Sequence, residues 1–269
     1  MRCAIVQKPG ADVRNLVLGE RETPEPGRGQ VRVRVEATAL NRADLLQRRG
    51  LYAVPPESPA DIPGLEFTGR VDRLGEGATR WEEGARVMGI VGGGAYAEQL
   101  VTHEDMVMPV PPAMSVEEAA ATPEAFVVAY DALVRQAGIQ PDQLVLVHSA
   151  TGGVGSAALQ LARAYGARVA GTCGHREKTE ALGRLVSFFP INYREHDFQT
   201  EIERAFGKNA VHIVLDTVGG AYWERNLALL AVQGKLILLG LLGGAKAETP
   251  LGTVLFKRIH IMGSNLRHR

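Results

Sequence analysis

The chain has 269 residues, 45% of them hydrophobic, and its 30 lysines and arginines balance 30 aspartates and glutamates. Because a formal net charge of zero attracts no polyanion, nucleic acid and anionic membrane surfaces are unexpected partners. No apolar run approaches the roughly 20 residues that span a bilayer, and residues 1–6 are typical of a strand rather than a signal peptide. The only cysteines, Cys3 and Cys173, fit a reducing compartment, so we expect a cytoplasmic protein, long enough for two domains.

Residues 1–120 predict a mostly β domain. Residues 31–35 alternate apolar and charged side chains, which is the period of a half-buried strand. Glycine- and proline-bearing turns separate this segment from further strand candidates at 67–74, 86–91 and 96–101. Residues 41–49 are expected to form a short helix that ends at Gly50. These elements predict a compact antiparallel barrel or sandwich.

A linker-like passage at 108–112 leads into a part of the chain with a different pattern. Ser115 is a good helix cap, and a further helix is expected from Pro123 to Gln136. Beyond it, helices alternate with strand candidates at 144–148, 168–172, 188–192, 211–216, 235–240 and 259–262. This alternation predicts an α/β fold with a doubly wound parallel sheet, the Rossmann architecture.

The stretch from Leu144 to Ala167 is typical of a dinucleotide-binding turn. A buried strand runs into a turn at 148–155, and an alanine-rich helix follows it. Such a turn directs backbone N–H groups and the positive end of a helix dipole at an anion. The spacing matches the dinucleotide fingerprint with alanine at its first position, so cofactor contacts are predicted for Ala150, Gly152, Gly153, Val154 and Gly155. The alternative is a glycine turn with a structural role only.

Short motifs occur along both halves of the chain. The first half has ALNRAD at 39–44, GLY at 50–52, PGLE at 63–66, GGGAYAE at 92–98 and AATPE at 120–124, and the C-terminal part has LFKR at 255–258 and GSNLR at 263–267. In combination they resemble the zeta-crystallin-type quinone oxidoreductases, zinc-independent members of the medium-chain dehydrogenase/reductase superfamily. The resemblance implies a GroES-like catalytic domain at 1–120, a Rossmann NADP-binding domain at 121–263 and a return to the catalytic domain at 264–269.

The sequence also departs from that family. Members continue well beyond the position of Arg269, so we expect the printed sequence to lack the C-terminal segment that normally completes the catalytic domain. Residues 186–188 replace the usual Gly-Ala-Asp, and Val128 stands where relatives often carry a threonine. These departures leave open an alternative from another class, a non-catalytic NADPH-binding protein or inactive relative.

The end of the second Rossmann strand indicates which nucleotide is bound. NAD enzymes usually have an acidic residue there for the ribose hydroxyls, whereas this strand continues Thr172-Cys173-Gly174-His175-Arg176-Glu177-Lys178. The missing acid and the nearby basic residues favour NADPH. By resemblance, Gly174, Lys178 and Tyr193 bind the phosphate-bearing adenosine end, and His175 adds a donor. The alternative is that Arg176 and Lys178 are only a solvated helix turn.

Two further loops follow the fourth and fifth Rossmann strands, at 216–220 and 240–244. Ligands of open α/β sheets bind at the carboxyl ends of strands, and glycines let the backbone approach them closely. We therefore predict cofactor contacts there, from Thr217, Val218, Gly240, Leu241 and Leu242. Ordinary βα turns are the alternative.

No metal is expected, because Asn41 and Leu65 stand where zinc-dependent relatives have a cysteine and a histidine ligand. His148 is interpreted as a hydrogen bonder at a strand end. Without a metal, the hydride acceptor must already be electron-poor, such as a quinone or an α,β-unsaturated carbonyl. By resemblance, Asn41 and Tyr52 bind it between the two domains, although Asn41 as a helix cap and Tyr52 as a packing residue are alternatives.

These features together predict an NADPH:quinone oxidoreductase, with the reduction of enones as a close variant. Residues 258–262 read as the last strand, at the edge of the Rossmann sheet, where unpaired backbone groups offer a site for another chain. Relatives join two such edges about a twofold axis, so a homodimer is expected. A monomer with a shielded edge is the alternative.

Overall fold

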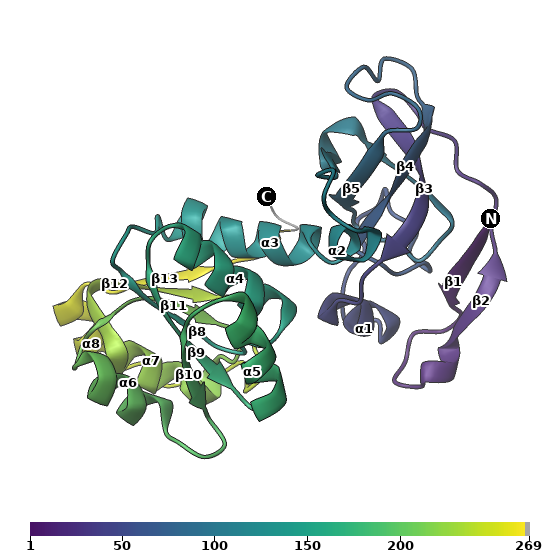
Figure 1. The fold of residues 1–269 in the computed structure, drawn as a ribbon. Coiled ribbons are helices and arrows are strands. Elements are labelled where there is room, and N and C mark those ends of the chain that lie inside the picture. The colour runs from purple at the N-terminus through teal and green to yellow at the C-terminus, as the bar shows by residue number, and fades with distance from the viewer. Residues whose placement is uncertain (267–269) are drawn as a thin grey trace. The chain divides into compact units, whose positions relative to one another are not determined.

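The computed structural model describes residues 1–266 (Figure 1). The chain divides into two compact units, the first from Met1 to Glu124 and the second from Ala125 onward. Each unit has its own sheets and its own hydrophobic core, and each is described by itself.

The first unit contains an antiparallel five-stranded sheet of order β6-β3-β4-β5-β7 and a separate β1-β2 pair. Its strands are β1 (Arg2–Val6), β2 (Leu16–Glu20), β3 (Gln30–Thr38), β4 (Glu66–Leu74), β5 (Arg86–Ile90), β6 (Gln99–His103) and β7 (Val107–Pro109). Its helices are α1 (Arg42–Arg48) and α2 (Val116–Ala120). The alternation predicted for β3 is present, with Val31 and Val33 fully buried and Arg34 exposed. The mostly β first half is therefore confirmed.

Two strands of this unit, β2 and β7, were not expected. The passage at 108–112 was interpreted as a linker, but Val107–Pro109 forms β7, in which Met108 pairs with Met88. The linker interpretation was wrong for these residues because Pro109 obscures the strand pattern. β7 is an edge strand, where a proline is tolerated since its missing N–H need not serve a neighbour.

The second unit contains a parallel six-stranded sheet of order β10-β9-β8-β11-β12-β13. Its strands are β8 (Leu144–Val147), β9 (Arg168–Cys173), β10 (Phe189–Asn192), β11 (Val211–Asp216), β12 (Leu230–Leu238) and β13 (His260–Gly263). Its helices are α3 (Pro123–Tyr130, beginning in the first unit), α4 (Gly153–Ala164), α5 (Arg176–Leu185), α6 (Phe198–Phe206), α7 (Trp223–Leu229) and α8 (Leu251–Lys257). This strand order is that of a doubly wound Rossmann sheet, as the sequence predicted.

Helices cover both faces of this sheet (Figure 1). On one face, residues of α3, α4 and α5 pack against Val145, Val147 and Ile213. On the other face, α6 and α7 pack against Leu144, Leu146 and other alternate strand residues. Because both of its faces are buried, the central strand β8 reads as a continuous apolar run, which explains why it was recognisable in the sequence.

The helix expected from Pro123 to Gln136 changes character part of the way along. It is α-helical to Tyr130 and continues as a π-helical stretch over Asp131–Gln136. Among residues 1–266, no helix is long and apolar enough to cross a membrane.

Of the segment expected to return to the catalytic domain, 264–269, residues 267–269 lie outside the described residues. Ser264 still contacts the second unit, where its N–H donates to the Leu238 carbonyl oxygen at 3.0 Å.

Candidate functional site

The predicted phosphate-binding turn lies between β8 and α4. All four residues of β8 are buried, and His148 follows them. Ser149 then adopts a left-handed backbone with a φ of 53°, and Gly152 is the cap of α4. The first N–H groups of a helix have no carbonyl partner within it. They and the positive end of the helix dipole are therefore available to an anion at this turn.

Gly155 is required by the close approach of α4 to the turn. A Cβ atom at this position would lie 2.8 Å from Ala150 Cα, and closer still to the Ser149 carbonyl oxygen. Both neighbours are backbone atoms, so no change of rotamer relieves the contact. The helix was predicted to follow Gly155, but it begins at Gly153. All predicted residues of the motif meet in this turn: Ala150 and Gly155 are buried, Val154 is half-buried, and Gly152 and Gly153 are exposed.

Gly174 and Tyr193, predicted at the adenosine end, lie against each other beyond β9. The Tyr193 N–H donates to the Cys173 carbonyl oxygen at 3.1 Å. A Cβ atom on Gly174 would lie 2.6 Å from the Tyr193 hydroxyl oxygen and 2.8 Å from its Cζ. Glycine is thus needed for the ring to lie over the strand end. The exposed ring offers a flat surface on which an aromatic base can stack.

The basic residues after β9 differ in their partners. Arg176 Nε donates to Glu180 Oε1 at 2.8 Å in an exposed i,i+4 ion pair. Lys178, in the first turn of α5, is exposed and forms no ion pair with any residue in the range 1–266. His175 precedes α5 and is also exposed. Arg176 is thus paired with Glu180, whereas Lys178 has no ion-pair partner among residues 1–266. Contact of Lys178 with a phosphate stays a prediction.

The loops after β11 and β12 are joined by backbone hydrogen bonds. Gly243 N–H donates to the Val218 carbonyl oxygen at 2.7 Å. A Cβ atom on Gly240 would lie 2.9 Å from the Thr217 carbonyl oxygen, so the two loops are in close contact. Ser149 Oγ lies 2.8 Å from Thr217 Oγ1, which links these loops to the phosphate-binding turn. The structure thus brings together the predicted residues Thr217, Val218, Gly240, Leu241 and Leu242, of which the two leucines are exposed.

A polar cluster is buried at the same strand ends. His148 Nδ1 lies 3.1 Å from Thr172 Oγ1, and His148 Nε2 lies 2.7 Å from Asn226 Oδ1. The rings of Phe198 and Tyr222 pack edge-on against the imidazole, with centroids 5.0 and 4.8 Å away. The interpretation of His148 as a strand-end hydrogen bonder is confirmed. Burial lowers the pKa of His148, which favours the neutral ring.

In the first unit, Asn41 is held by a buried carboxylate. Asn41 precedes α1 as its cap residue, and its Nδ2 donates to Glu66 Oε1 at 2.7 Å. Glu66 Oε2 accepts from the Glu124 N–H at 2.9 Å. Burial raises the pKa of the Glu66 carboxyl. Within residues 1–266, one of the two Asn41 amide hydrogens is engaged, so the other can donate to a ligand.

A second buried carboxylate fixes the start of α1. Asp44 Oδ2 accepts from the Asn41 N–H at 2.7 Å and from the Tyr96 hydroxyl at 2.9 Å. Asp44 Oδ1 accepts from the Gly64 N–H at 3.2 Å. Burial raises the pKa of Asp44 and of Tyr96, and the Asp44 charge adds to the effect on Tyr96. Asn41 is therefore anchored through both its backbone and its side chain.

Tyr52 lies in the loop that follows α1 and is half-buried. The Leu51 N–H donates to the Leu46 carbonyl oxygen at 2.9 Å, which ties the start of this loop to the helix. Asn41 and Tyr52 thus belong to the same helix-loop segment of the first unit. Their roles toward a substrate stay predictions.

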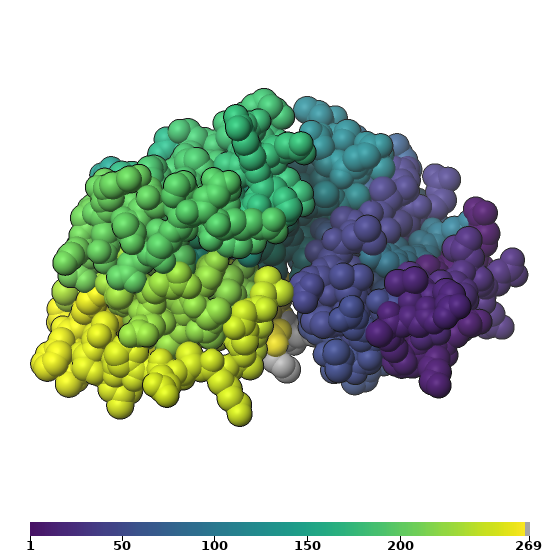
Figure 2. Space-filling model, turned by 90° about the horizontal axis from the view of Figure 1, so that it is seen from below, coloured from purple at the N-terminus to yellow at the C-terminus, as the bar shows by residue number. Residues whose placement is uncertain are grey.

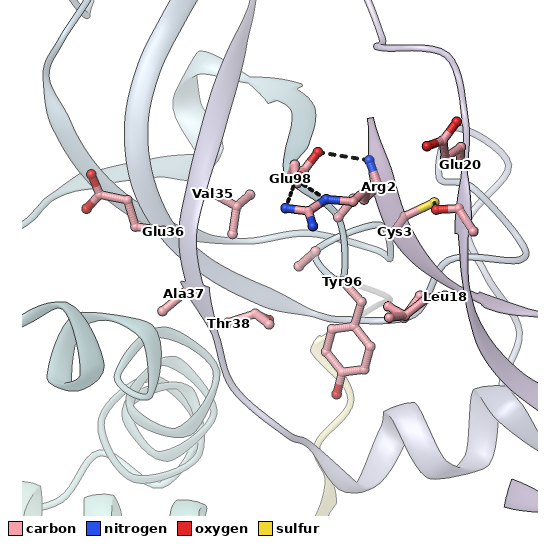
Figure 3. A pocket seen from close by; sticks show the side chains of 14 residues that line it. Arg2, Cys3, Leu18, Glu20, Val35, Glu36, Ala37, Thr38, Tyr96 and Glu98 are labelled. Atoms are coloured by element: carbon pink, nitrogen blue, oxygen red, sulfur yellow. Dashed lines mark hydrogen bonds and ion pairs between the residues drawn. The ribbon is translucent and has the colours of Figure 1, made fainter.

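The first unit also contains a hollow of about 530 Å³, whose lining includes neither Asn41 nor Tyr52. It is bounded by β1, β2, the end of β3 and residues 95–98 (Figure 3). Arg2 and Glu98 lie along it with an ion pair of 2.6 Å, and the Tyr96 ring contributes to its wall. The hollow is thus separate from the residues predicted to bind the acceptor.

No three or more histidine, cysteine, aspartate or glutamate side chains are grouped as metal ligands among residues 1–266. Leu65, at one of the two positions compared with zinc ligands, is buried in the core. Independence from zinc stays a prediction.

The sequence did not single out several buried polar residues that support these sites. Asp44 and Tyr96 anchor Asn41 across 52 residues of chain, and Asn226 joins His148 across 78 residues. Glu66 was recognised only as the last residue of the PGLE motif, next to Leu65. A glutamate directly before the strand candidate at 67–74 was an available signal, because a buried charge requires a partner.

Comparison with known proteins relates both units to one superfamily. The family described as alcohol dehydrogenase GroES-like domain matches residues 27–112, and the family described as zinc-binding dehydrogenase matches residues 153–269. Quinone oxidoreductase-like protein 2 of Mus musculus is 33% identical over 242 residues, which are 89% of this chain and 69% of the mouse protein. The synaptic vesicle membrane protein VAT-1 homolog of Homo sapiens is 37% identical over 243 residues, which are 90% of this chain and 61% of the human protein.

A solved structure agrees with these sequence relatives. The quinone oxidoreductase of Escherichia coli, complexed with NADPH, superimposes with a TM-score of 0.87 at 31% identity. The match covers 100% of this chain and 82% of the Escherichia coli chain. The chain therefore belongs to the medium-chain dehydrogenase/reductase superfamily, among its quinone oxidoreductase-like members.

Proposed function

We propose that the protein is an NADPH-dependent oxidoreductase that reduces a quinone or an enone without zinc. The observation that carries the proposal comes from the residues that follow β8 and β9 in the second unit. There a glycine turn without room for a Cβ atom lies beside a strand end with no acid and an available lysine. These residues fit NADPH, since a carboxylate after β9 would repel its 2′-phosphate.

The residues of the second unit bind and orient the cofactor in this proposal. The first amides of α4 donate to the diphosphate, and Lys178 pairs with the 2′-phosphate. Tyr193 stacks on the adenine, while the joined loops at Thr217 and Gly240 give the nicotinamide a close backbone surface. Bound NADPH supplies the hydride.

Asn41 is our candidate for the residue that binds the acceptor. Its amide nitrogen, fixed by Glu66, donates its second hydrogen to a carbonyl oxygen of the acceptor, where negative charge develops as hydride arrives. A neutral amide gives less stabilisation than a metal ion. An acceptor that is already electron-poor, a quinone or an enone, therefore fits the site better than a simple ketone. The names of two similar proteins, the quinone oxidoreductase-like protein 2 of Mus musculus and the quinone oxidoreductase of Escherichia coli, support this choice.

The test has two steps. Fluorescence titration with NADPH measures binding, and NADPH oxidation is then followed at saturating cofactor with an ortho-quinone, a para-quinone and an enone, in buffer containing a metal chelator. We expect NADPH to bind and at least one acceptor to be turned over. The chelator should not lower the rate of this turnover. Binding without turnover of any acceptor contradicts the catalytic proposal, and loss of activity in the chelator contradicts zinc independence.

We also propose a homodimer formed through β13, in a reducing compartment. β13 is the edge strand of the parallel sheet, and α8 just before it exposes Leu251, Leu255 and Phe256. This C-terminal segment, yellow in Figure 2, lies at the surface of the second unit. An open edge beside exposed apolar side chains supports association with a second copy. Both cysteines are free and buried, which supports the reducing compartment.

A further inference from the structure

A continuous chain of hydrogen bonds crosses the core of the second unit from β9 to the loop after β11. Beyond the contacts of His148 with Thr172 and Asn226, Asn226 Nδ2 donates to Asp216 Oδ2 at 3.2 Å. Asp216 Oδ1 accepts from the Val218 N–H at 2.7 Å and from the Gly219 N–H at 3.0 Å. The four linked side chains are at most 1% exposed. The mechanism above uses none of them.

The chemistry of the groups gives this chain one direction. A carboxylate only accepts, so the Asn226 amide nitrogen must face Asp216 and the amide oxygen must face His148. His148 Nε2 must then carry the proton and donate to that oxygen. Its Nδ1 is left as an acceptor for the Thr172 hydroxyl. Each hydrogen bond from Thr172 to Asp216 therefore has its donor on the Thr172 side and its acceptor on the Asp216 side. Asp216 also accepts hydrogen bonds from two backbone N–H groups.

The turn at the end of this chain has a backbone that needs support. Gly219 has a φ of 77° and a ψ of −129°, a conformation open to glycine alone. A Cβ atom on it would also lie 2.8 Å from the Gly244 carbonyl oxygen. Two N–H donors to one buried carboxylate oxygen fix this turn, and with it the loop after β12.

The position of this turn in the sheet indicates which half of the cofactor it faces. The predicted adenosine contacts follow β9, and the phosphate-binding turn follows β8. β11 lies on the opposite side of β8 from β9. A dinucleotide that extends across the strand ends in this order places its nicotinamide half over the loop after β11.

We propose that Thr172, His148, Asn226 and Asp216 form a one-way hydrogen-bond relay that positions the turn Thr217–Gly219 for the nicotinamide half of the cofactor. They are positioning residues, since they reach the cofactor only through the turn. The inference rests on the proposed NADPH function for its ligand, but the direction of the relay is a property of the protein alone.

The direction can be measured without cofactor by nitrogen-15 NMR of histidine-labelled protein. A His148→Gln variant identifies the His148 signals among those of the seven histidines. We expect His148 to be neutral with its proton on Nε2. In Asp216→Asn the new amide donates to Asn226, which must turn over, and the His148 proton must move to Nδ1. A wild-type proton on Nδ1, or an unchanged tautomer in Asp216→Asn, overturns the relay.

The positioning role is measured by binding of two probes to Asn226→Ala and Asp216→Asn. NADPH contacts the turn, whereas 2′,5′-ADP has only the adenosine end. We expect NADPH affinity to fall about tenfold or more, as for the loss of a hydrogen bond to a charged group, while 2′,5′-ADP affinity stays within about twofold. Unchanged NADPH affinity, or an equal loss for both probes, overturns the role. Failure of wild-type protein to bind NADPH would instead reject the proposed function and leave the tautomer result standing.

Discussion

Replacing Gly155 by alanine tests whether the nucleotide turn is as tightly packed as the structure shows. The added methyl group would lie 2.8 Å from Ala150 Cα and closer to the Ser149 carbonyl oxygen. Gly153 provides a matched control in the same helix turn, because its Cβ would meet only Ala125 Cβ at 3.8 Å. The two variants have the same composition and differ only in what the methyl group contacts.

The expected size follows from two opposing effects. Overpacking against backbone costs about 3 kcal/mol, near the upper end of its usual range, since backbone yields less readily than a side chain. Alanine in place of glycine in a helix offsets about 1 kcal/mol of this. Gly155→Ala should thus lower the free energy of unfolding by about 2 kcal/mol, whereas Gly153→Ala should leave it unchanged or raise it slightly. In a protein of this size, each kcal/mol shifts Tm by about 2–4 °C.

Urea unfolding and thermal melting of both variants and the wild type measure these differences. NADPH titration then measures whether the turn between β8 and α4 keeps its affinity for the cofactor. Gly155→Ala should also bind NADPH more weakly, because relief of the contact displaces Ser149 and Ala150. If Gly155→Ala is as stable as Gly153→Ala and binds NADPH with wild-type affinity, the close approach of helix and turn is not a property of the protein in solution.

Four further predictions concern other parts of the molecule. Lys178→Ala should weaken NADPH binding by about tenfold or more and leave NADH binding unchanged. The control Arg176→Ala should affect the binding of neither nucleotide. Equal losses for both nucleotides in Lys178→Ala would contradict the assignment of Lys178 to the 2′-phosphate. Asn41→Ala should lower kcat/KM for the acceptor by about tenfold or more without changing NADPH affinity in titration, and an unaltered kcat/KM would remove Asn41 from the site. Because burial lowers the pKa of His148 below its ordinary 6.5, its contribution to stability is complete above that pH and is lost as the pH falls toward the lowered value. The free energy of unfolding should decrease by up to about 1.4 kcal/mol per pH unit in this window, and His148→Gln should show a shallower dependence in urea titrations at each pH. Ile261→Pro should convert a dimer to a monomer in light scattering by deleting a backbone N–H at the sheet edge, and a monomeric wild type at micromolar concentration would refute the dimer.

The sequence predicted the second unit well because its signals are local. β8 is a run of four buried apolar residues, and α6 has a side-chain cap at Asp197 and a glycine cap at Gly207. In the first unit, β2 contains glycine and glutamate, and β7 contains a proline. These residues disfavour strands in isolation, and only pairing with β1 and β5 forms the strands. Such long-range pairing leaves no local pattern to read.

Long-range contacts also limit the prediction of the candidate sites. Residues predicted to contact a ligand have a local sequence pattern, whereas the residues that support them do not. Residues predicted to form the phosphate-binding turn, such as Gly155, belong to motifs of consecutive residues, so spacing identifies them. Supporting residues such as Asn226 and Glu66 are isolated polar side chains whose role depends on a partner far along the chain. A buried polar group without a partner costs several kcal/mol, so each such residue implies a distant partner even before the fold is known. The sequence does not show that Asp216 and Asn226 are buried. Burial is what requires these two side chains to have hydrogen-bond partners, and those partners fix the loop after β11.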